Sequence, residues 1–373
     1  MTAYARKEGL LPRIGIKDMS KKVLVAMSGG VDSAVAALLI KQKGYGLGGI
    51  TMIVWNDGKM LSDSNAPIPD INCADAKAIA EQLNIPHHTV AYGDSFRSQV
   101  IESFIESYKN GQTPNPCVTC NKHIKFGKLY QSAVALGYDT LATGHYARIE
   151  KNADGTYLLK KAIDASKDQS YFLWAIDRSI LSNVLFPLGE YSKTEIREIA
   201  AKNNFANAHR SDSQDICFIA DGDYASFIKR NCDCAFPEGS FVDLQGKVIG
   251  THSGIINYTV GQRKGLGVAF GKPMFVGSKD SERNTVTLCT DAELYTDTLI
   301  ADSINLLVDD TLETPTRLQA KIRYRHTPAT ATILRIAENK LTVKFDEPQR
   351  AIAPGQSLVL YDGDTVVGGG IIE

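Results

Sequence analysis

The sequence predicts an α/β fold with a parallel sheet, followed by a small central domain and a C-terminal all-β barrel. From residue 21 to about residue 210, short apolar runs alternate with helical stretches, which is typical of β-α-β units. From residue 283 to residue 373, short alternating runs are separated by Gly, Pro, Asn and Asp, which is typical of a barrel or a sandwich. The glycine-rich stretch 211–282 joins these regions, and a length of 373 residues suits two or three domains.

The α/β region has strands and helices in the alternating order that a sheet covered on both faces requires. Its expected strands are Val23–Met27, Ile50–Trp55, His87–Ala91 and Asp139–Thr143. Its expected helices are Ala34–Lys43, Cys73–Leu83, Phe96–Tyr108, Lys122–Leu136 and Thr194–Asn203. A hairpin is expected over Ala147–Lys161, because Asn152–Gly155 at its centre is a turn signal.

The C-terminal region has the alternating pattern of an all-β domain. Its expected strands are Val286–Cys289, Leu318–Tyr324, Thr330–Ile336, Leu341–Phe345 and Ser357–Tyr361. Residues 1–20 lack the apolar core and the cleavage site of a secretory signal, so we expect a flexible N-terminal extension. No stretch is long and apolar enough for a transmembrane helix, and we expect a cytoplasmic protein with no membrane partner.

Charge and cysteine content narrow the classes of function. The net charge is −1, from 41 Lys+Arg against 42 Asp+Glu, which excludes a protein held to nucleic acid by bulk positive charge but leaves room for a local basic patch. Seven cysteines is an odd number in a long chain without a secretory signal. A disulfide framework is therefore not expected, and individual thiols are candidates for chemistry.

The strongest local signal is the segment Ser28–Ser33, SGGVDS, which follows an expected strand and precedes an expected helix. Its two glycines leave backbone amides accessible beside a helix N-terminus, an arrangement that binds phosphate. Ser28 and Ser33 add hydroxyl donors, and we expect Asp32 to hold a Mg²⁺ ion that bridges the phosphates. The alternative is a tight turn in which these side chains only cap the helix. The pattern GxxxxGK followed by Ser or Thr is absent, which excludes a Walker-type ATPase.

Cys117 and Cys120 lie in the polar segment Thr113–Asn121, just before a helix expected from Lys122. Two prolines stiffen this segment and hold its thiols in fixed directions. A nearby helix N-terminus stabilises a thiolate, and so do neighbouring cations. The neighbouring cations are Lys122, His123 and Lys125.

The other cysteines divide by their surroundings. Cys217 also lies in a polar, turn-rich setting, whereas Cys73 and Cys289 sit in apolar patterns typical of buried, inert thiols. Cys232 and Cys234 fit neither class. One CxxC is half of a zinc site, and no second pair follows at finger spacing. Two activated thiols far apart in sequence fit sulfur transfer, in which one carries a persulfide and the other helps release its terminal sulfur.

Seven separated motifs between Lys22 and Glu373 together resemble the bacterial tRNA-specific 2-thiouridylases, a family with an ATP-pyrophosphatase loop in a Rossmann-like parallel sheet. The motifs are SGGVDS, TPNPCVTCN (Thr113–Asn121), ATGHYA (Ala142–Ala147), KDQSYFL (Lys167–Leu173), SQDICFI (Ser213–Ile219), YTVGQRKGLG (Tyr258–Gly267) and IRYRHTP (Ile322–Pro328). The resemblance implies ATP-dependent 2-thiolation of the wobble uridine of tRNA by a tRNA-uridine 2-sulfurtransferase. It also implies an ATP-pyrophosphatase domain at 21–210, a small central domain at 211–282 and a tRNA-binding β-barrel at 283–373.

The same resemblance implies roles for individual residues. ATP contacts are implied for Ala26, Met27, Ser28, Gly29, Gly30, Val31, Asp32, Ser33, Met52 and Gly144. Cys120 would be the nucleophile and Cys217 the persulfide carrier, and the two would form a transient disulfide. The target base would meet Asn115, Pro116 and Cys117, and tRNA would contact His145, Lys167, Asp168, Gln169, Arg323, Tyr324 and Gln356. The implied partners are tRNA and a cysteine desulfurase or sulfur-relay protein that donates the persulfide, and we expect a monomer.

One residue departs from the family. Many members carry Asp where this chain has Cys117, and that carboxylate is a candidate acid or base. A thiol cannot play that role in the same way. Cys117, Cys120 and Cys217 could instead hold an iron–sulfur cluster with one open iron. Apart from this cluster and the Mg²⁺ ion expected at Asp32, no metal site is expected.

Two other functions explain part of the sequence. An adenylating ligase for a small molecule explains SGGVDS but gives no task to the paired thiols or to the basic β domain. An RNA-binding protein with a vestigial nucleotide fold explains only the C-terminal half. The family resemblance favours a phosphate contact and base stacking for Lys321–His326. That segment is otherwise the charged face of an edge strand.

Overall fold

The computed structural model describes residues 21–56, 59–64, 73–207, 216–219, 221–267, 271–308 and 312–373, so the extension expected at 1–20 lies outside it. The chain forms two compact units. The first comprises Met1–Ser95, Ile124–Ser170 and Ile176–Ser211, and the second comprises Phe96–His123, Tyr171–Ala175 and Asp212–Glu373. Among the described residues, no helix has the length and apolar character needed to cross a membrane.

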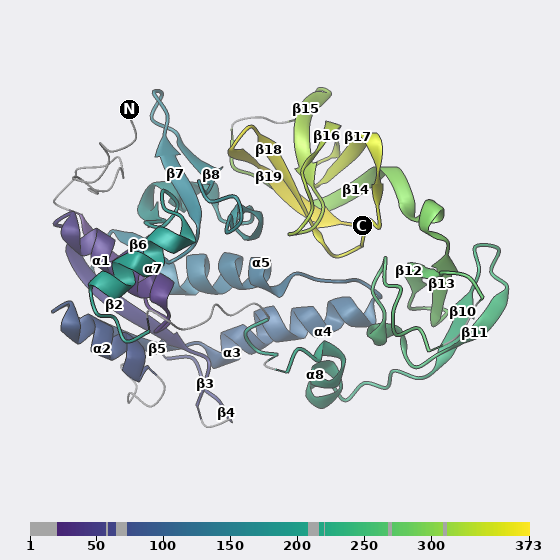
Figure 1. Cartoon of the computed structure of the whole chain (residues 1–373), viewed down its shortest axis with the longest axis horizontal. Helices are drawn as coiled ribbons and strands as arrows, with labels where there is room; N and C mark the ends of the chain where they lie inside the picture. Colours follow the sequence, from purple (N-terminus) through teal and green to yellow (C-terminus); the bar gives the residue numbers. More distant parts are fainter. Residues whose placement is uncertain are drawn as a thin grey trace, which may run out of the picture. The chain divides into compact units, whose positions relative to one another are not determined.

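The first unit is built on a five-stranded parallel sheet, as predicted (Figure 1). Its strands, in spatial order, are β5 (His87–Ala91), β2 (Gly46–Ile53), β1 (Lys22–Ala26), β6 (Thr140–Ala142) and β9 (Val184–Leu185). The chain builds outward from β1 through β2 to β5, then returns to the other side of β1 for β6 and β9. The carboxyl ends of β1 and β6 therefore form a topological switch point, where sheets of this kind bind ligands.

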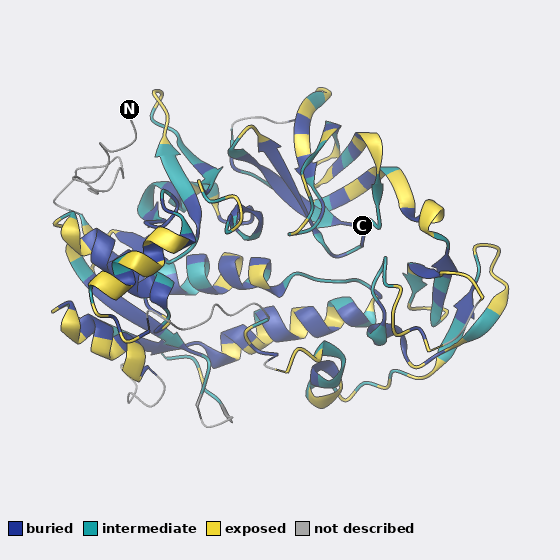
Figure 2. Cartoon of the chain, in the orientation of Figure 1, coloured by how far each residue is buried: buried dark blue, intermediate teal, exposed yellow. Residues whose placement is uncertain are grey.

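Helices α1 (Val31–Gln42), α2 (Ala74–Gln82) and α7 (Lys193–Lys202) pack with this sheet in one apolar core. Helix α1 is almost wholly buried, because nine of its residues, from Val31 to Ile40, lie in the interior. Figure 2 shows the central strands and α1 largely in the buried colour. The expected hairpin is confirmed as β7 (Ala147–Lys151) and β8 (Tyr157–Lys161). A smaller hairpin joins β3 (Trp55–Asn56) to β4 (Lys59–Met60).

Two long helical runs begin earlier than predicted. One passes through α3 (Gly93–Phe96), η1 (Arg97–Ile101) and α4 (Glu102–Lys109). The other passes through α5 (Pro116–Cys120), η2 (Asn121–Leu129) and α6 (Tyr130–Ala135). The expected start of the second helix at Lys122 was wrong, because Pro116 occupies the first helical position, where its missing N–H costs nothing. Cys117 and Cys120 are therefore in the first turns of the helix and not in a loop before it.

The second unit contains two all-β bodies. The smaller is a four-stranded sheet of β11 (Val248–His252), β10 (Gly239–Val242), β13 (Thr285–Cys289) and β12 (Phe275–Asp280), preceded by α8 (Tyr224–Asn231). The larger consists of β14 (Tyr295–Leu306), β17 (Lys340–Arg350), β16 (Ala329–Ala337), β15 (Thr316–Lys321), β18 (Ser357–Asp362) and β19 (Thr365–Ile372). Because β19 also pairs with β14, these six antiparallel strands close into the predicted barrel.

The barrel differs from the prediction at its seam and at one strand end. Strands β14 and β19 were not predicted, and β19 carries three consecutive glycines. A side chain at Gly369 would meet the Trp174 ring at 2.8 Å, and one at Gly370 would meet the Asp302 carbonyl oxygen at 2.6 Å, so only glycine fits this closing strand. The strand expected to reach Tyr324 ends at Lys321, and the residues that follow form a turn. Short 3-10 helices lie at Ser170–Phe172, Arg178–Asn183, Ile255–Asn257 and Asp291–Leu294.

Candidate functional site

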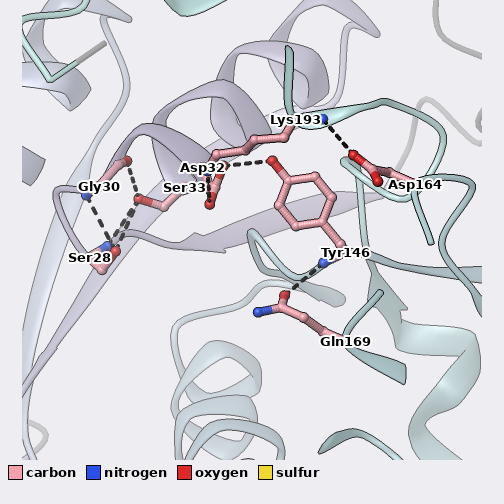
Figure 3. A network of polar contacts seen from close by, with 8 residues as sticks. All are labelled: Ser28, Gly30, Asp32, Ser33, Tyr146, Asp164, Gln169 and Lys193. Carbon is pink, nitrogen blue, oxygen red and sulfur yellow. Dashed lines mark hydrogen bonds and ion pairs between the residues drawn. The ribbon is translucent and has the colours of Figure 1, made fainter. Parts of the chain in front are cut away.

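The loop after β1 has the geometry of an anion cradle (Figure 3). Gly29 has φ +77°, a left-handed conformation that favours glycine. The Ser33 hydroxyl accepts a hydrogen bond from the Ser28 N–H at 3.2 Å and donates one to the Gly30 carbonyl at 3.0 Å. Gly30 caps helix α1 without any side-chain hydrogen bond, so the first N–H groups of the helix are left for a ligand. Local contacts therefore shape the loop and leave its helix end open to phosphate.

The residues predicted to contact ATP meet around this loop. Gly144 follows β6, and a Cβ atom there would lie 3.0 Å from the backbone of Asp32 and of Ser33, so a larger residue would push the two segments apart. On the other side, the Met27 N–H donates to the Ile50 carbonyl at 2.8 Å, which aligns the end of β1 with β2. Met52 lies near the end of β2 and is partly exposed. The structure thus brings the loop, Gly144 and the end of β2 to one edge of the sheet.

Asp32 is occupied by an ion pair. The Lys193 ammonium lies 2.8 Å and 2.9 Å from its two carboxylate oxygens, and the Tyr146 hydroxyl donates to it at 2.8 Å (Figure 3). Only 10% of the Lys193 side chain is exposed, and its ammonium also lies 5.7 Å from the centre of the Tyr146 ring. An ammonium therefore stands where a cation ligated by Asp32 would bind. The residues do not fit the magnesium role expected for Asp32.

The turn at Lys167–Gln169 is tied to this network. The Gln169 side-chain oxygen accepts from the Tyr146 N–H at 2.9 Å, and the Gln169 N–H donates to the Tyr146 carbonyl at 2.8 Å. Asp168 is buried and accepts hydrogen bonds from Ser170 and from the Ala162 N–H. Its carboxylate therefore shapes the turn. Through Tyr146, a turn predicted to contact tRNA is joined to the loop predicted to bind ATP.

His145 is held as a neutral ring. Its Nδ1 lies 2.6 Å from the Thr143 hydroxyl and its Nε2 lies 3.4 Å from the Lys125 ammonium, while Phe126 and Phe186 pack against the ring at 5.9 Å. Burial, and then the charge of Lys125, hold the pKa of His145 well below its ordinary value. In this arrangement His145 carries no positive charge for a phosphate at neutral pH.

We call the helical run from Pro116 to Ala135, which carries Cys117 and Cys120, the cysteine helix. It begins at Pro116, with Asn115 as its N-cap in an extended conformation. Cys117 is exposed, and Cys120 is buried. His123, two residues into η2, has its pKa lowered from the ordinary 6.5 by burial and then by Lys122. The lowered pKa favours the neutral ring at pH 7, so His123 adds little of the positive charge that was expected near the thiols.

We call Thr113–Asn121 the cysteine segment. Residues from the barrel and from the KDQSYFL motif form hydrogen bonds with both of its ends. Before the helix, the Thr113 N–H donates to the Pro354 carbonyl at 2.8 Å, and the Gln356 side chain donates to the Thr113 carbonyl at 2.7 Å. After Cys120, the Asn121 side chain donates to the Phe172 carbonyl at 2.9 Å. The Phe172 ring in turn lies 4.4 Å from that of Tyr324. Two residues expected to contact tRNA are thus part of this support: Gln356 bonds to the cysteine segment directly, and Tyr324 packs against Phe172, which bonds to it.

Arg323, the remaining expected tRNA contact, donates to the Arg350 carbonyl at 3.0 Å. Cys217 is exposed, and its neighbour Phe218 is buried among the rings of Phe96, Phe104 and Phe227 at 5.2–5.6 Å. Phe218 thus anchors the chain beside an accessible thiol. Ser213–Asp215 of the same motif lie outside the described residues.

The other cysteines follow the prediction where one was made. Cys73 and Cys289 are buried, and burial raises the pKa of the Cys289 thiol. Cys232 and Cys234 form a disulfide. In the part of the chain that the structure describes, no three or more His, Cys, Asp or Glu side chains gather as a metal site. The three cysteines considered for an iron–sulfur cluster are all described and do not fit one.

Sequence reasoning missed three residues at this edge of the sheet. Lys193 and Tyr146 hold Asp32, and Asn207 donates to the Gly29 carbonyl at 2.7 Å. The side-chain oxygen of Asn207 is buried without a hydrogen-bond partner, as expected of an acceptor that awaits a ligand. A capping box from Ser192 to Glu195 marks the start of α7 and could have drawn attention to Lys193. No local signal places Asn207 beside the loop.

The chain matches three family models in succession. A model described as the tRNA methyl transferase HUP domain matches residues 21–221. The tRNA methyl transferase PRC-barrel domain matches residues 225–290, and the aminomethyltransferase β-barrel domain matches residues 296–372. These matches agree with a parallel-sheet domain, a central domain and a closed C-terminal barrel.

Curated relatives match almost the whole chain. The tRNA-specific 2-thiouridylase MnmA of Clostridioides difficile is 48% identical over 356 residues, covering 95% of this chain and 99% of the relative. The corresponding protein of Caldanaerobacter subterraneus is 45% identical over 361 residues, covering 95% of this chain and 98% of the relative. A solved 4-thiouridine synthetase–RNA complex with bound ATP has a TM-score of 0.33 and 17% identity, covering 57% of this chain and 50% of that chain. That likeness is too low to carry an argument.

Proposed function

The chain belongs to the family of tRNA-specific 2-thiouridylases, and from this premise we propose that it uses ATP to replace the 2-oxygen of the wobble uridine of tRNA with sulfur. The observation that carries the proposal is the match to 2-thiouridylases along 95% of the chain. The anion cradle at the switch point and the accessible thiol of Cys217 support it independently. The assignment of the two units to one reaction rests on the family.

The first step is adenylation of the uridine. The wobble base leaves its stack, because its 2-carbonyl cannot be reached within a stacked anticodon. The open N–H groups at the start of α1 bind the phosphates of ATP, and the 2-carbonyl oxygen attacks the α-phosphorus as pyrophosphate leaves. Asp32 is paired with Lys193 and is assigned no metal ion. Asn207 offers its buried oxygen to the nucleotide.

The second step is sulfur transfer. A persulfide on Cys217 attacks C2 of the adenylated base with its terminal sulfur, and AMP leaves with the former carbonyl oxygen. The base is then joined to Cys217 through a disulfide. The Cys120 thiolate attacks the Cys217 sulfur, which releases 2-thiouridine and leaves a Cys120–Cys217 disulfide. An external thiol reductant restores both thiols before the next turnover.

The exposure of Cys217 supports its role as the persulfide carrier, because a donor protein must reach it. The donor is a cysteine desulfurase or a sulfur-relay protein. Asn115, Pro116 and the exposed Cys117, at the start of the cysteine helix, meet the target base. Gly144 and Met52 contribute to the ATP site, while Arg323, Tyr324 and Gln356 belong to the tRNA-binding half. The enzyme acts as a cytoplasmic monomer.

Nucleoside mass spectrometry of tRNA tests the proposal. A strain that lacks the gene should lose 2-thiouridine derivatives, and the wild-type chain should restore them. Cys120→Ser and Cys217→Ser should each fail to restore them, whereas Cys289→Ser, which alters a buried thiol outside the reaction, should restore near-normal levels. Thiolation by the Cys217→Ser protein would refute the persulfide role.

Exchange of labelled pyrophosphate into ATP separates this function from its rivals. We expect exchange that depends on added tRNA, because the uridine is the group that is adenylated. Exchange that needs no tRNA would favour a ligase for a small molecule. Binding of tRNA without any exchange would favour an RNA-binding protein.

A further inference from the structure

The motif YTVGQRKGLG has no role in the steps above, yet it lies in a charge-biased part of the chain. Between Asp243 and Asp280 the sequence contains five Lys or Arg residues and no Asp or Glu. The whole chain is almost neutral, at a net charge of −1. A stretch that keeps positive charge and excludes negative charge suits a polyanionic partner.

The structure shows how this segment is held. We call Thr259–Gly267 the basic loop. Its start is pinned to β12, because the Gly261 N–H donates to the Val276 carbonyl at 2.8 Å and the Val276 N–H donates to the Gln262 carbonyl at 2.9 Å. The Gln262 side chain fixes the interior, since it accepts from the Thr259 N–H at 2.9 Å and donates to the Lys264 carbonyl at 3.0 Å. Leu266 is buried near the end of the loop. The backbone that carries Arg263 and Lys264 is therefore ordered.

The two cations of the basic loop differ from two exposed, paired cations of the barrel, Arg317 and Lys344. Arg317 pairs with Asp346, and Lys344 pairs with Asp297, so these positive charges are neutralised within the chain. Arg263 and Lys264 are both exposed, and neither forms an ion pair with a carboxylate in the described ranges. Because the backbone that carries these two charges is already ordered, less conformational entropy is lost when they bind phosphates.

We propose that the basic loop is an RNA-binding element of the central domain and that Arg263 and Lys264 bind phosphates of the tRNA. The inference rests on the proposed function, since it assigns a surface to the same substrate. Contacts to the phosphate backbone supply affinity and register without reading bases. The central domain would thereby hold the tRNA at a place distinct from the cysteine helix and from the barrel.

Salt dependence of tRNA binding tests the assignment in the full-length protein. An unmodified tRNA transcript is titrated with the wild type and with the Arg263→Gln/Lys264→Gln variant over a series of KCl concentrations. Each lost phosphate contact should lower the slope of log affinity against log salt by about 1, so the double variant should lose about 2 from the slope and about tenfold or more in affinity. The charge-preserving Arg263→Lys/Lys264→Arg variant should stay within about threefold of the wild type.

The matched control is Arg317→Gln/Lys344→Gln, which removes the same formal charge from cations that are already paired. Its salt slope should stay near that of the wild type. An unchanged slope for the basic-loop variant, or an equal loss in both double variants, would overturn the assignment. A wild-type protein that does not bind tRNA would instead contradict the proposed function, while ATP binding without tRNA should be the same in all variants.

Discussion

The nucleotide loop and the cysteine helix are held in different ways. In the loop, the decisive contacts are a hydroxyl network within six consecutive residues and one partly buried ion pair between Asp32 and Lys193. In the cysteine segment, the decisive contacts are hydrogen bonds to backbone carbonyls, and the Gln356 donor lies 243 residues away in sequence. One site therefore depends on a balance of charge and the other on the position of distant structure. The difference predicts which variants should damage ATP chemistry and which should damage sulfur transfer.

The largest effect is expected from the ion pair at the loop. Lys193→Met leaves the Asp32 carboxylate unpaired in a partly buried position beside the phosphates. We expect tRNA-dependent pyrophosphate exchange to fall by about 100-fold or more, because an uncompensated negative charge opposes ATP and the developing pyrophosphate. Loading of a persulfide onto Cys217, followed by mass spectrometry of the intact protein, should be unchanged. An equal loss of pyrophosphate exchange and of persulfide loading would show that the two regions do not act independently.

A double variant separates the charge balance from folding. Asp32→Asn/Lys193→Met removes both charges, and replacing a whole buried pair is often close to neutral for stability. We expect its urea-unfolding midpoint to return from the lowered value of Lys193→Met toward that of the wild type. Pyrophosphate exchange should recover with it, because the uncompensated negative charge of Asp32 is gone. Exchange that stays low while stability returns would show that the missing Lys193 ammonium, and not the uncompensated charge of Asp32, causes the loss.

A smaller effect is expected at the cysteine segment. Gln356→Ala removes the hydrogen bond to the Thr113 carbonyl, which lies just before the N-cap of the cysteine helix. A loosened helix start should lower the thiolation rate by about tenfold, since a catalytic thiol that is misplaced by a fraction of an ångström reacts more slowly. Persulfide loading and ATP binding should be retained. Single-turnover thiolation of a tRNA transcript provides the measurement.

Two further substitutions make the Gln356 prediction specific. Gln356→Glu replaces the donor with an acceptor that cannot bond the Thr113 carbonyl, so it should be at least as impaired as Gln356→Ala. Gln319→Ala removes an exposed glutamine of β15 and should have no measurable effect. If Gln356→Ala lowers only the affinity for tRNA and leaves the single-turnover rate at saturation intact, Gln356 contacts tRNA and does not position the helix.

The same contrast explains how much could be read from the sequence. The loop was predictable because SGGVDS is contiguous and lies between a strand and a helix of clear periodicity. Its partner Lys193 was not, because it is 161 residues from Asp32 and only the folded sheet brings them together. The start of the cysteine helix was misplaced because Pro116 suits a loop and a first helical turn equally well.

In the barrel, the local hydrophobic pattern predicted strands wrongly at two places where packing against distant residues decides the structure. Ile322 is buried and extends the apolar alternation past Lys321, yet the chain turns there and places Tyr324 against Phe172. Strand β19 was missed because glycines are rare in strands. Here they are required by the Trp174 ring and by the adjacent strand β14. Packing against residues far apart in the chain cannot be recognised from a short window of sequence.

The last prediction concerns stability instead of activity, at a partly buried lysine that, unlike Lys193, bonds to carbonyls. The Lys279 ammonium donates to the Tyr258 carbonyl at 2.9 Å, lies 3.5 Å from the Gln112 carbonyl and sits 5.7 Å from the Tyr108 ring centre. Burial lowers the pKa of Lys279 from 10.5 to about 8. Between these values the unfolded chain binds more protons than the folded one. The penalty that the charged Lys279 places on folding is therefore full below about pH 8 and is lost as the pH rises to about 10.5.

A comparison of the wild type with Lys279→Met isolates that contribution. Other lysines and tyrosines titrate in the same window, but they cancel in the difference between the two unfolding free energies. We expect this difference to move in favour of the wild type by up to about 3 kcal/mol across the window, as a shift of this size implies, and to stay constant at lower pH. Urea unfolding at a series of pH values measures it. Parallel pH profiles would mean that Lys279 keeps its proton in the folded state without a penalty. The carbonyls around its ammonium would then offset its charge fully, as Asp32 offsets that of Lys193.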